Sequence, residues 1–238
     1  MIGLGTIINV AAIIIGGLGG LVFGKLLTER FQDTLIRALG VCTMFIGISG
    51  TMEKMLTISD GALVGGDSMM VIISMAVGAV FGELINLDEK LEKFGEWLKQ
   101  KTGNAKDKSF VHGFVTTSLT VCIGAMAIVG AINDGIFGDY SILVAKSALD
   151  LVLVMVMTAS MGKGCIFSAI PVGILQGSVT VLAKMIEPLM TDAALYNLSM
   201  VGSMLIFCVG VNLIWERKIK VANMLPALVI AVVWALVG

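Results

Sequence analysis

Residues 16–26 read GGLGGLVFGKL, and residues 74–84 repeat the pattern as SMAVGAVFGEL. Small residues recur at every fourth position of both stretches: Gly16, Gly20 and Gly24 in the first, and Ser74, Gly78 and Gly82 in the second. In a membrane, small residues at this spacing let two helix backbones approach closely. Two copies in long apolar runs predict a polytopic membrane protein built by duplication, as many transporters are.

The composition agrees with a membrane protein. The chain is 57% hydrophobic and 14% charged, whereas a soluble domain is about 25% charged. Its mean hydropathy is +0.99. The net charge of -1 argues against nucleic-acid binding, which requires a concentrated basic face. The single His112 and four cysteines without a CxxC pair predict neither a metal site nor a cofactor.

The apolar runs predict the fold class. A spanning helix needs about 20 mostly apolar residues, and eight segments qualify: 3–24, 36–56, 66–87, 110–132, 141–161, 165–186, 196–214 and 222–238. We therefore expect an all-α, polytopic membrane bundle of about eight short, glycine-rich helices, with residues 1–238 forming a single integral membrane domain. The last segment is short and the turn at 162–164 is tight, so a re-entrant segment at either place is the alternative.

The positive charges predict the orientation. All but three of the 16 lysines and arginines lie in or beside odd-numbered loops, the exceptions being Lys54, Lys146 and Lys184. Because positive loops stay cytoplasmic, we expect the odd loops inside and both termini outside.

The repeat extends into the following helices. Val41-Cys42 and Gly50 in the second span match Val121-Cys122 and Gly130 in the fourth. The repeating unit is thus predicted to be a helical hairpin, with copies at 3–56 and 66–132, followed by the remaining spans at 141–238.

The second odd loop contains an amphipathic segment, residues 88–100. Leu87, Leu91, Phe94 and Leu98 share one helical stripe, and charged residues fill the other face. This pattern is typical of a helix lying on the cytoplasmic leaflet. The alternative is a solvated helix packed on the protein's own loops.

One ionisable residue lies midway along a predicted span. Asp150 is central in the fifth segment, where a charge costs roughly 2.5–3.5 kcal/mol. Lys146 lies one helical turn earlier and can pair with it, and Ser147 lies beside that face. We expect these three residues to take part in binding a substrate or ion. The alternative is an internal ion pair that only orients the helix.

The sixth segment carries a second polar group near its middle, Gln176. Pro171 frees a backbone carbonyl about one turn earlier, and Ser168 precedes it. Gly173 and Gly177 are predicted to form another close-packing ridge. A helix broken here would present carbonyls to a ligand; a mild kink, with Gln176 bonded to a neighbouring helix, is the alternative.

Four further polar residues are candidates for solute binding. Asn9 lies in the first span and Asn212 near the inner end of the seventh, where each alternatively cross-links helices. Asn133 and Asp134 end the fourth span on the outer side. There they line a vestibule, or, as the alternative, they only terminate the helix, because an Asn-Asp-Gly sequence is typical of helix ends.

The sequence contains no HExxH, GxSxG or Walker motif. We therefore expect no enzymatic activity and no ATP-driven step.

Several motifs resemble a bacterial integral membrane family known as domain of unknown function 554. They are GTIIN at 5–9 with the glycine ridge that follows, GAMAIVGAI at 124–132, DG at 134–135 with GD at 138–139, KSALD at 146–150, and SAIPV at 168–172 with QG at 176–177. Asn133 departs from the Gln or Glu expected in similar sequences. The resemblance implies a permease-like protein of the bacterial inner membrane and no defined substrate.

These features lead to two functional hypotheses. The first is a secondary transporter or channel for a small solute or ion across the bacterial cytoplasmic membrane. The second is a non-transporting membrane scaffold or partner protein whose glycine ridges serve assembly. In both, the lipid bilayer surrounds the chain, no nucleic acid is bound, and exposed ridges make a homo-oligomer, a dimer or higher, the expected state.

Overall fold

A computed structural model of the chain describes residues 2–59, 62–215 and 219–237. Its α-helices are α1 (Leu4–Gly24), α2 (Glu29–Met55), α3 (Ser68–Ile85), α4 (Leu87–Lys101), α5 (Phe110–Cys122), α6 (Ala125–Phe137), α7 (Ser141–Met161), α8 (Ala169–Val181), α9 (Ala183–Ile186), α10 (Asp192–Trp215) and α11 (Pro226–Val237). Three 3-10 helices, η1 (Lys163–Ser168), η2 (Glu187–Leu189) and η3 (Val221–Met224), and two strands, β1 (Leu56–Ser59) and β2 (Ala62–Gly65), complete the described elements. The predicted all-α helix bundle is confirmed.

Within the described residues, six helical segments are long and apolar enough to cross a membrane. They are α1, α2, α3, α7, α10 and the continuous run of η1 and α8. A seventh is formed if α5 and α6, which meet at a 62° bend, make one broken span. Residues 221–237 are a shorter apolar segment, so the predicted count of about eight is not reached by length and composition alone.

The fourth predicted span differs from the structure in two ways. It breaks after Cys122, where Gly124 has φ +155°, a conformation that a side chain would disfavour. It also continues through the Asn133-Asp134-Gly135 sequence, so the predicted stop there is wrong. The helix ends at Gly138, which has φ +67° and whose N–H bonds the Asp134 carbonyl oxygen, because glycine in a left-handed conformation terminates helices readily.

The contacts within the chain divide it into two compact units. Unit 1 comprises residues 1–39, 89–122 and 126–186; unit 2 comprises residues 40–88, 123–125 and 187–238. Each has its own buried apolar cluster.

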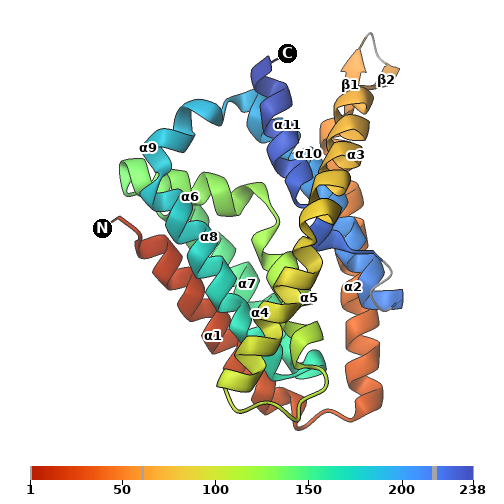
Figure 1. Ribbon diagram of the computed structural model, residues 1–238, viewed down its shortest axis with the longest axis vertical. Helices are drawn as coiled ribbons and strands as arrows, with labels where there is room; N and C mark the ends of the chain where they lie inside the picture. The colour runs from red at the N-terminus through yellow and green to blue at the C-terminus, as the bar shows by residue number, and fades with distance from the viewer. Residues whose placement is uncertain (1, 60–61, 216–218, 238) are drawn as a thin grey trace. The chain divides into compact units, whose positions relative to one another are not determined.

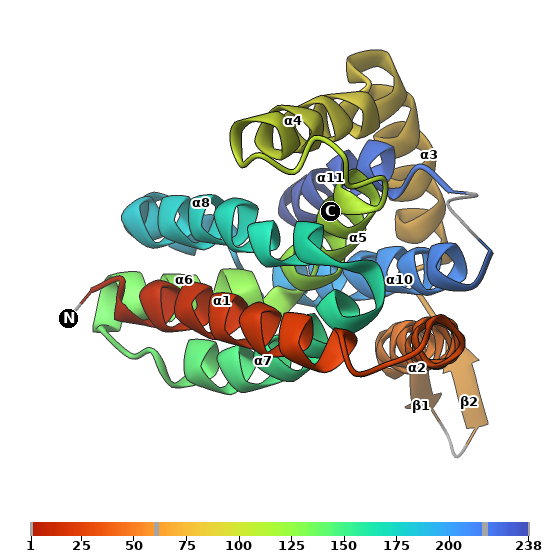
Figure 2. The same ribbon diagram turned by 90° about the horizontal axis from the view of Figure 1, so that it is seen from below.

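In unit 1 the first glycine ridge packs against α7. A methyl group at Gly16 would overlap the carbonyl oxygen of Leu151, and one at Gly20 would overlap that of Met155. The residue numbers in contact increase together along the two helices, so α1 and α7 run parallel. Figures 1 and 2 show them side by side. This close approach of two backbones is the role predicted for small residues at spacing four.

The run of η1 and α8 packs on α1 in the opposite direction. Ile166 contacts Gly17, whereas Val10 lies 3.3 Å from the position of a methyl group on Gly173. Nothing lies within 4 Å of such a methyl group on Gly177. The ridge predicted on this helix therefore makes a close approach at Gly173 and not at Gly177, which faces open space.

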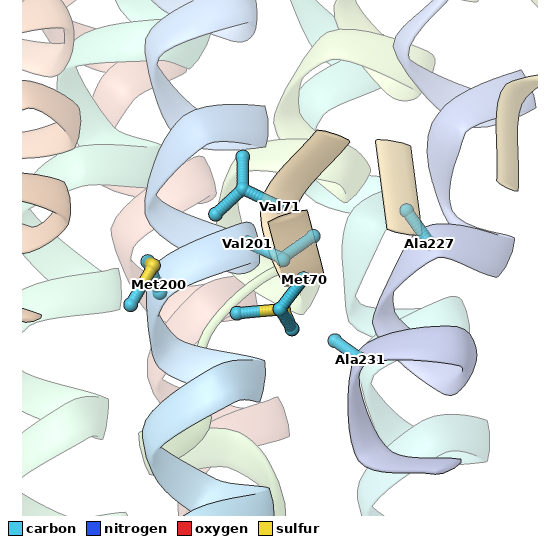
Figure 3. Close-up of a cluster of buried hydrophobic side chains, with 6 residues drawn as sticks. All are labelled: Met70, Val71, Met200, Val201, Ala227 and Ala231. Atoms are coloured by element: carbon cyan, nitrogen blue, oxygen red, sulfur yellow. The ribbon is translucent and has the colours of Figure 1, made fainter. Parts of the chain in front are cut away.

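In unit 2 the second glycine ridge packs against η3 and α11. A methyl group at Gly78 would overlap the backbone of Ala227, and one at Gly82 would overlap the carbonyl oxygen of Asn223. The buried cluster beside it joins α3, α10 and α11 (Figure 3) through Met70, Val71, Met200, Val201, Ala227 and Ala231. The third member of the ridge, Ser74, is fully buried.

The amphipathic segment forms α4, as expected, and its apolar face packs partly on the protein. Phe94 meets the ring of Phe114 on α5 edge-on, with the ring centroids 5.8 Å apart, and Leu98 is buried. Trp97 stays half exposed. The apolar face of α4 therefore rests on the protein, as in the alternative, but against helix α5 and not only on loops as that alternative stated.

The segment between the second and third predicted spans adds a feature that we did not predict. Strands β1 and β2 pair antiparallel, with Leu56 opposite Gly65 and Thr57 opposite Val64. This hairpin continues directly from the end of α2 (Figure 1).

Candidate functional site

A buried ion pair lies inside unit 1. The Lys146 ammonium donates to Oδ2 of Asp150 at 2.6 Å, and the Asn9 side-chain amide donates to the same oxygen at 3.1 Å. These residues are 7%, 4% and 0% exposed, respectively. The spacing of four residues on α7 predicted the pair; the contact with Asn9, which joins α7 to α1, required the tertiary structure.

The neighbouring Ser147 is buried but already bonded. Its hydroxyl donates to the Leu143 carbonyl oxygen at 2.6 Å, one turn earlier on α7. This bond within the helix occupies the hydroxyl proton, so Ser147 offers only its oxygen lone pairs to a ligand.

Gln176 on α8 is fully buried, and neither Nε2 nor Oε1 has a hydrogen-bond partner within the protein. The side-chain oxygen Oδ1 of Asn9 also has no hydrogen-bond partner within the protein. Native proteins leave few buried polar atoms unsatisfied, and each such atom calls for an explanation. The side chains of Asn9 and Gln176 therefore leave hydrogen-bonding capacity unused inside unit 1.

The unsatisfied groups are concentrated in unit 1. Among the described residues, the buried side-chain polar atoms without a hydrogen-bond partner are those of Thr6, Asn9, Thr117, Ser118, Thr158, Ser160, Ser168, Gln176 and Thr180. Every one of these residues belongs to unit 1. Asn9, Ser168 and Gln176 were predicted as candidates, and the sequence places Thr158 on or beside the face of Asp150. The others were missed, because a serine or threonine inside an apolar run is ordinary on sequence evidence alone: Thr6, Thr117, Ser118, Ser160 and Thr180.

An apolar layer separates these polar groups into two sets. It consists of Ile13 on α1, Val121 on α5, Val154 on α7, and Ala169 and Val172 on α8. Asn9 and Asp150 lie four residues before Ile13 and Val154 on parallel helices. Gln176 lies four residues after Val172 on the antiparallel helix, so all three polar residues lie on the same side of the layer.

The other set lies on the opposite side of the layer. Thr158 follows Val154 by one turn, Ser168 precedes Val172 by four residues, and Thr117 precedes Val121 by one turn of α5, which runs antiparallel to α7. Unit 1 thus has two polar layers with an apolar layer between them. We refer to the set of Asn9, Lys146, Asp150 and Gln176 as the amide–ion-pair layer.

Asp134 has a structural role that the sequence did not indicate. It is fully buried on α6, and its two carboxylate oxygens accept the backbone N–H groups of Gly3 at 3.2 Å and Gly5 at 3.0 Å. These N–H groups belong to the start of α1, where the helix dipole favours a negative charge. The vestibule role considered for Asp134 is therefore replaced by capping of α1; Asn133 lies beside it on α6, half-buried.

We expect the Asp134→Asn variant to unfold more easily than wild type by about 1–2 kcal/mol, the usual cost of losing a charged helix cap. The amide can accept only one of the two N–H groups. The midpoint of denaturant or thermal unfolding in detergent measures this loss.

The Asp139→Asn variant is the control. Asp139 also accepts a helix-starting N–H, that of Ser141 at 3.0 Å, and hydrogen bonds from the backbone and side chain of Ser141 lower the pKa of its carboxyl group. It is exposed, so water replaces what the substitution removes and the midpoint should barely move. Equal midpoints for the Asp134→Asn variant and wild type would contradict the capping role.

Asn212 belongs to unit 2, and its amide is engaged with the backbone. Nδ2 donates to the Ile219 carbonyl oxygen at 2.6 Å, and Oδ1 accepts the Ile219 N–H at 2.9 Å. Both ends of the amide are used by the connection that follows α10, so Asn212 has a structural role here but does not cross-link two helices as the alternative stated. A second structural amide of unit 2, Asn223, was missed: it donates to Glu83 at 2.6 Å and accepts the N–H of Asp88 at 2.7 Å.

Comparison with known proteins assigns the sequence to a family. The profile described as "Protein of unknown function (DUF554)" matches residues 4–236. The chain belongs to the DUF554 family. This confirms the resemblance found from the sequence motifs.

Two relatives of this DUF554 member cover nearly its whole length. The chain is 28% identical over 229 residues to the uncharacterized membrane protein YdfK of Bacillus subtilis, covering 95% of the chain and 93% of YdfK. It is also 28% identical over 232 residues to the uncharacterized protein YqgA of Escherichia coli, covering 96% of the chain and 94% of YqgA. No solved structure matches. The family, the apolar helices and the relative named as a membrane protein together indicate a multi-pass membrane protein.

Proposed function

We propose that this protein is a secondary transporter or channel that moves a small solute or ion across the bacterial cytoplasmic membrane through unit 1. The observation that carries the proposal is the amide–ion-pair layer. Charged and polar groups are expensive at membrane depth and are usually retained there to contact a substrate, an ion or water. The hydrogen-bonding capacity left free on Gln176 and Asn9 is the second support.

The relative direction of α1 and α7 agrees with the part of the proposed topology that lies between them. Because α1 and α7 run parallel, an odd number of crossings must separate them. Helices α2 and α3 account for two, and we propose that the bent pair of α5 and α6 forms the third. Transporter substrate sites are typically formed by such interrupted helices.

The competing proposal is a scaffold or partner protein without transport. One observation favours it: Lys146 and Asp150 neutralise each other, as an internal staple would. The expectation that the glycine ridges serve assembly no longer supports the scaffold, because both ridges pack within the chain and are not exposed. Any homo-oligomer would have to use other surfaces.

A ligand screen tests the proposal. We expect at least one compound from a panel of ions, amines, amino acids, organic acids, amides and polyols to raise the melting temperature of the purified protein. A ligand at 100 times its Kd stabilises the folded state by about 2.7 kcal/mol. The same compound should give a smaller shift for the Asp150→Asn variant, each variant being compared with its own ligand-free melting temperature.

The Asp192→Asn variant, which changes an exposed carboxylate at the start of α10, should respond like wild type. A panel in which no compound shifts wild type, combined with proteoliposomes no more permeable than protein-free liposomes, would refute transport and favour the scaffold.

A further inference from the structure

The hydrogen-bonding pattern of the amide–ion-pair layer defines a class of solute. We infer that this layer binds a small uncharged solute carrying both hydrogen-bond donors and acceptors, such as a simple amide or polyol. The inference rests on the proposed function and specifies its substrate. The side chain of Gln176 and the side-chain oxygen Oδ1 of Asn9 recognise the solute. The ion pair positions the Asn9 side chain.

The charge balance of the layer disfavours an ion. Lys146 and Asp150 are paired at 2.6 Å and together carry no net charge. The other buried charge among the described residues of unit 1, Asp134, is committed to the start of α1. A bound ion would therefore remain uncompensated in a buried site, at a cost much larger than a hydrogen bond can offset.

The ion pair fixes the direction of the Asn9 amide. Its Nδ2 donates to Asp150, so Oδ1 is the end left without a partner. Gln176 has both Nε2 and Oε1 free, and the hydroxyls of Thr6 and Thr180 lie one turn beyond Asn9 and Gln176 on the same helices, also unsatisfied. The free groups are thus acceptors and donors together, which a solute with both kinds of group can satisfy.

The adjacent apolar layer also favours neutral solutes over ions. Ile13, Val154 and Val172 offer no polar atoms to replace an ion's hydration shell, and hydrophobic constrictions exclude charged species more strongly than neutral ones. A neutral solute loses only the hydration of its dipoles in crossing this layer.

Stopped-flow light scattering of proteoliposomes tests the inference, with urea, acetamide and glycerol as uncharged probes. Potassium chloride, ammonium chloride and glycine are the charged and zwitterionic probes. We expect at least one uncharged probe to enter faster than into protein-free liposomes, and the other three to enter at the protein-free rate. The Gln176→Met variant, which keeps the shape and removes both amide atoms, should reduce the protein-dependent rate about tenfold.

Two controls separate recognition from folding. Gln100→Met makes the same change at an exposed position of α4 and should leave the rate unchanged. Because Gln176 has no partner within the protein, its replacement should leave the melting temperature equal or higher; a clearly lower value would show that Gln176 is structural and overturn its assignment.

The outcomes distinguish this inference from the proposed function. If potassium, ammonium or glycine enters in a protein-dependent way and the uncharged probes do not, transport stands and the inference is overturned. If the Gln176→Met variant carries an uncharged probe at the wild-type rate, the assigned site is wrong. If no probe enters and no compound shifts the melting temperature, transport and the inference fall together.

Discussion

The Lys146→Met variant is expected to lose about 3–5 kcal/mol of folding stability, the usual effect of removing one partner of a buried ion pair. Methionine fills much of the space of the lysine stem but leaves the Asp150 carboxylate, 4% exposed, with Asn9 as its remaining partner in the amide–ion-pair layer. The measurement is the midpoint of unfolding in mixed detergent, followed by circular dichroism.

The double variant Lys146→Met/Asp150→Leu separates the ion pair from the burial of each side chain. It should recover most of the loss, because apolar replacement of both partners of a buried pair is often neutral. Lys184→Met, at an exposed position on α9, is the matched control and should shift the midpoint little. A Lys146→Met protein as stable as wild type would mean that Asp150 is neutralised by something other than Lys146.

The second large effect is expected at the first glycine ridge. Gly16→Val should destabilise the protein by about 3 kcal/mol or more, the upper end of the usual cost of overpacking. The added methyl groups would overlap the carbonyl oxygen of Leu151, and a backbone group cannot move aside as a flexible side chain can. Size-exclusion chromatography and the melting temperature in detergent report the loss.

Gly177→Val provides the comparison on α8. It makes the same substitution in a helix at a glycine where an added Cβ would have no neighbour within 4 Å, so the variant tests only the helix propensity of valine. A Gly16→Val protein that melts with wild type would contradict the packing of α1 on α7. A Gly177→Val protein that melts far below wild type would contradict the open space beside Gly177 on α8.

The helices could be predicted closely because each depends on local information. The fifth predicted span, 141–161, coincides with α7, and the first, 3–24, differs from α1 by one residue at its start. Apolar length and the turn residues at the ends suffice for such segments. The break after Cys122 escaped prediction, since Gly124 inside an apolar run looks like any other small residue of a packed helix.

The candidate site was predicted in part, for a similar reason. The pair of Lys146 and Asp150 follows from their spacing on one helix, whereas the second bond to Asp150 comes from Asn9, 141 positions away. Asp134 illustrates the opposite case. Its local sequence predicts a helix stop, but the contact that gives it a role is with the first residues of the chain.

The sequence by itself therefore determined that this chain is a membrane protein, where its helices lie, and at what depth along each helix the polar residues occur. Those properties depend on residue type and spacing, which act within a single helix. The tertiary structure alone decided that α1 packs against α7, and that Asn9, Asp150 and Gln176 share one side of an apolar layer. The physical reason is that helix pairing depends on the fit of complete surfaces from distant segments, and many pairings are compatible with the same local periodicity.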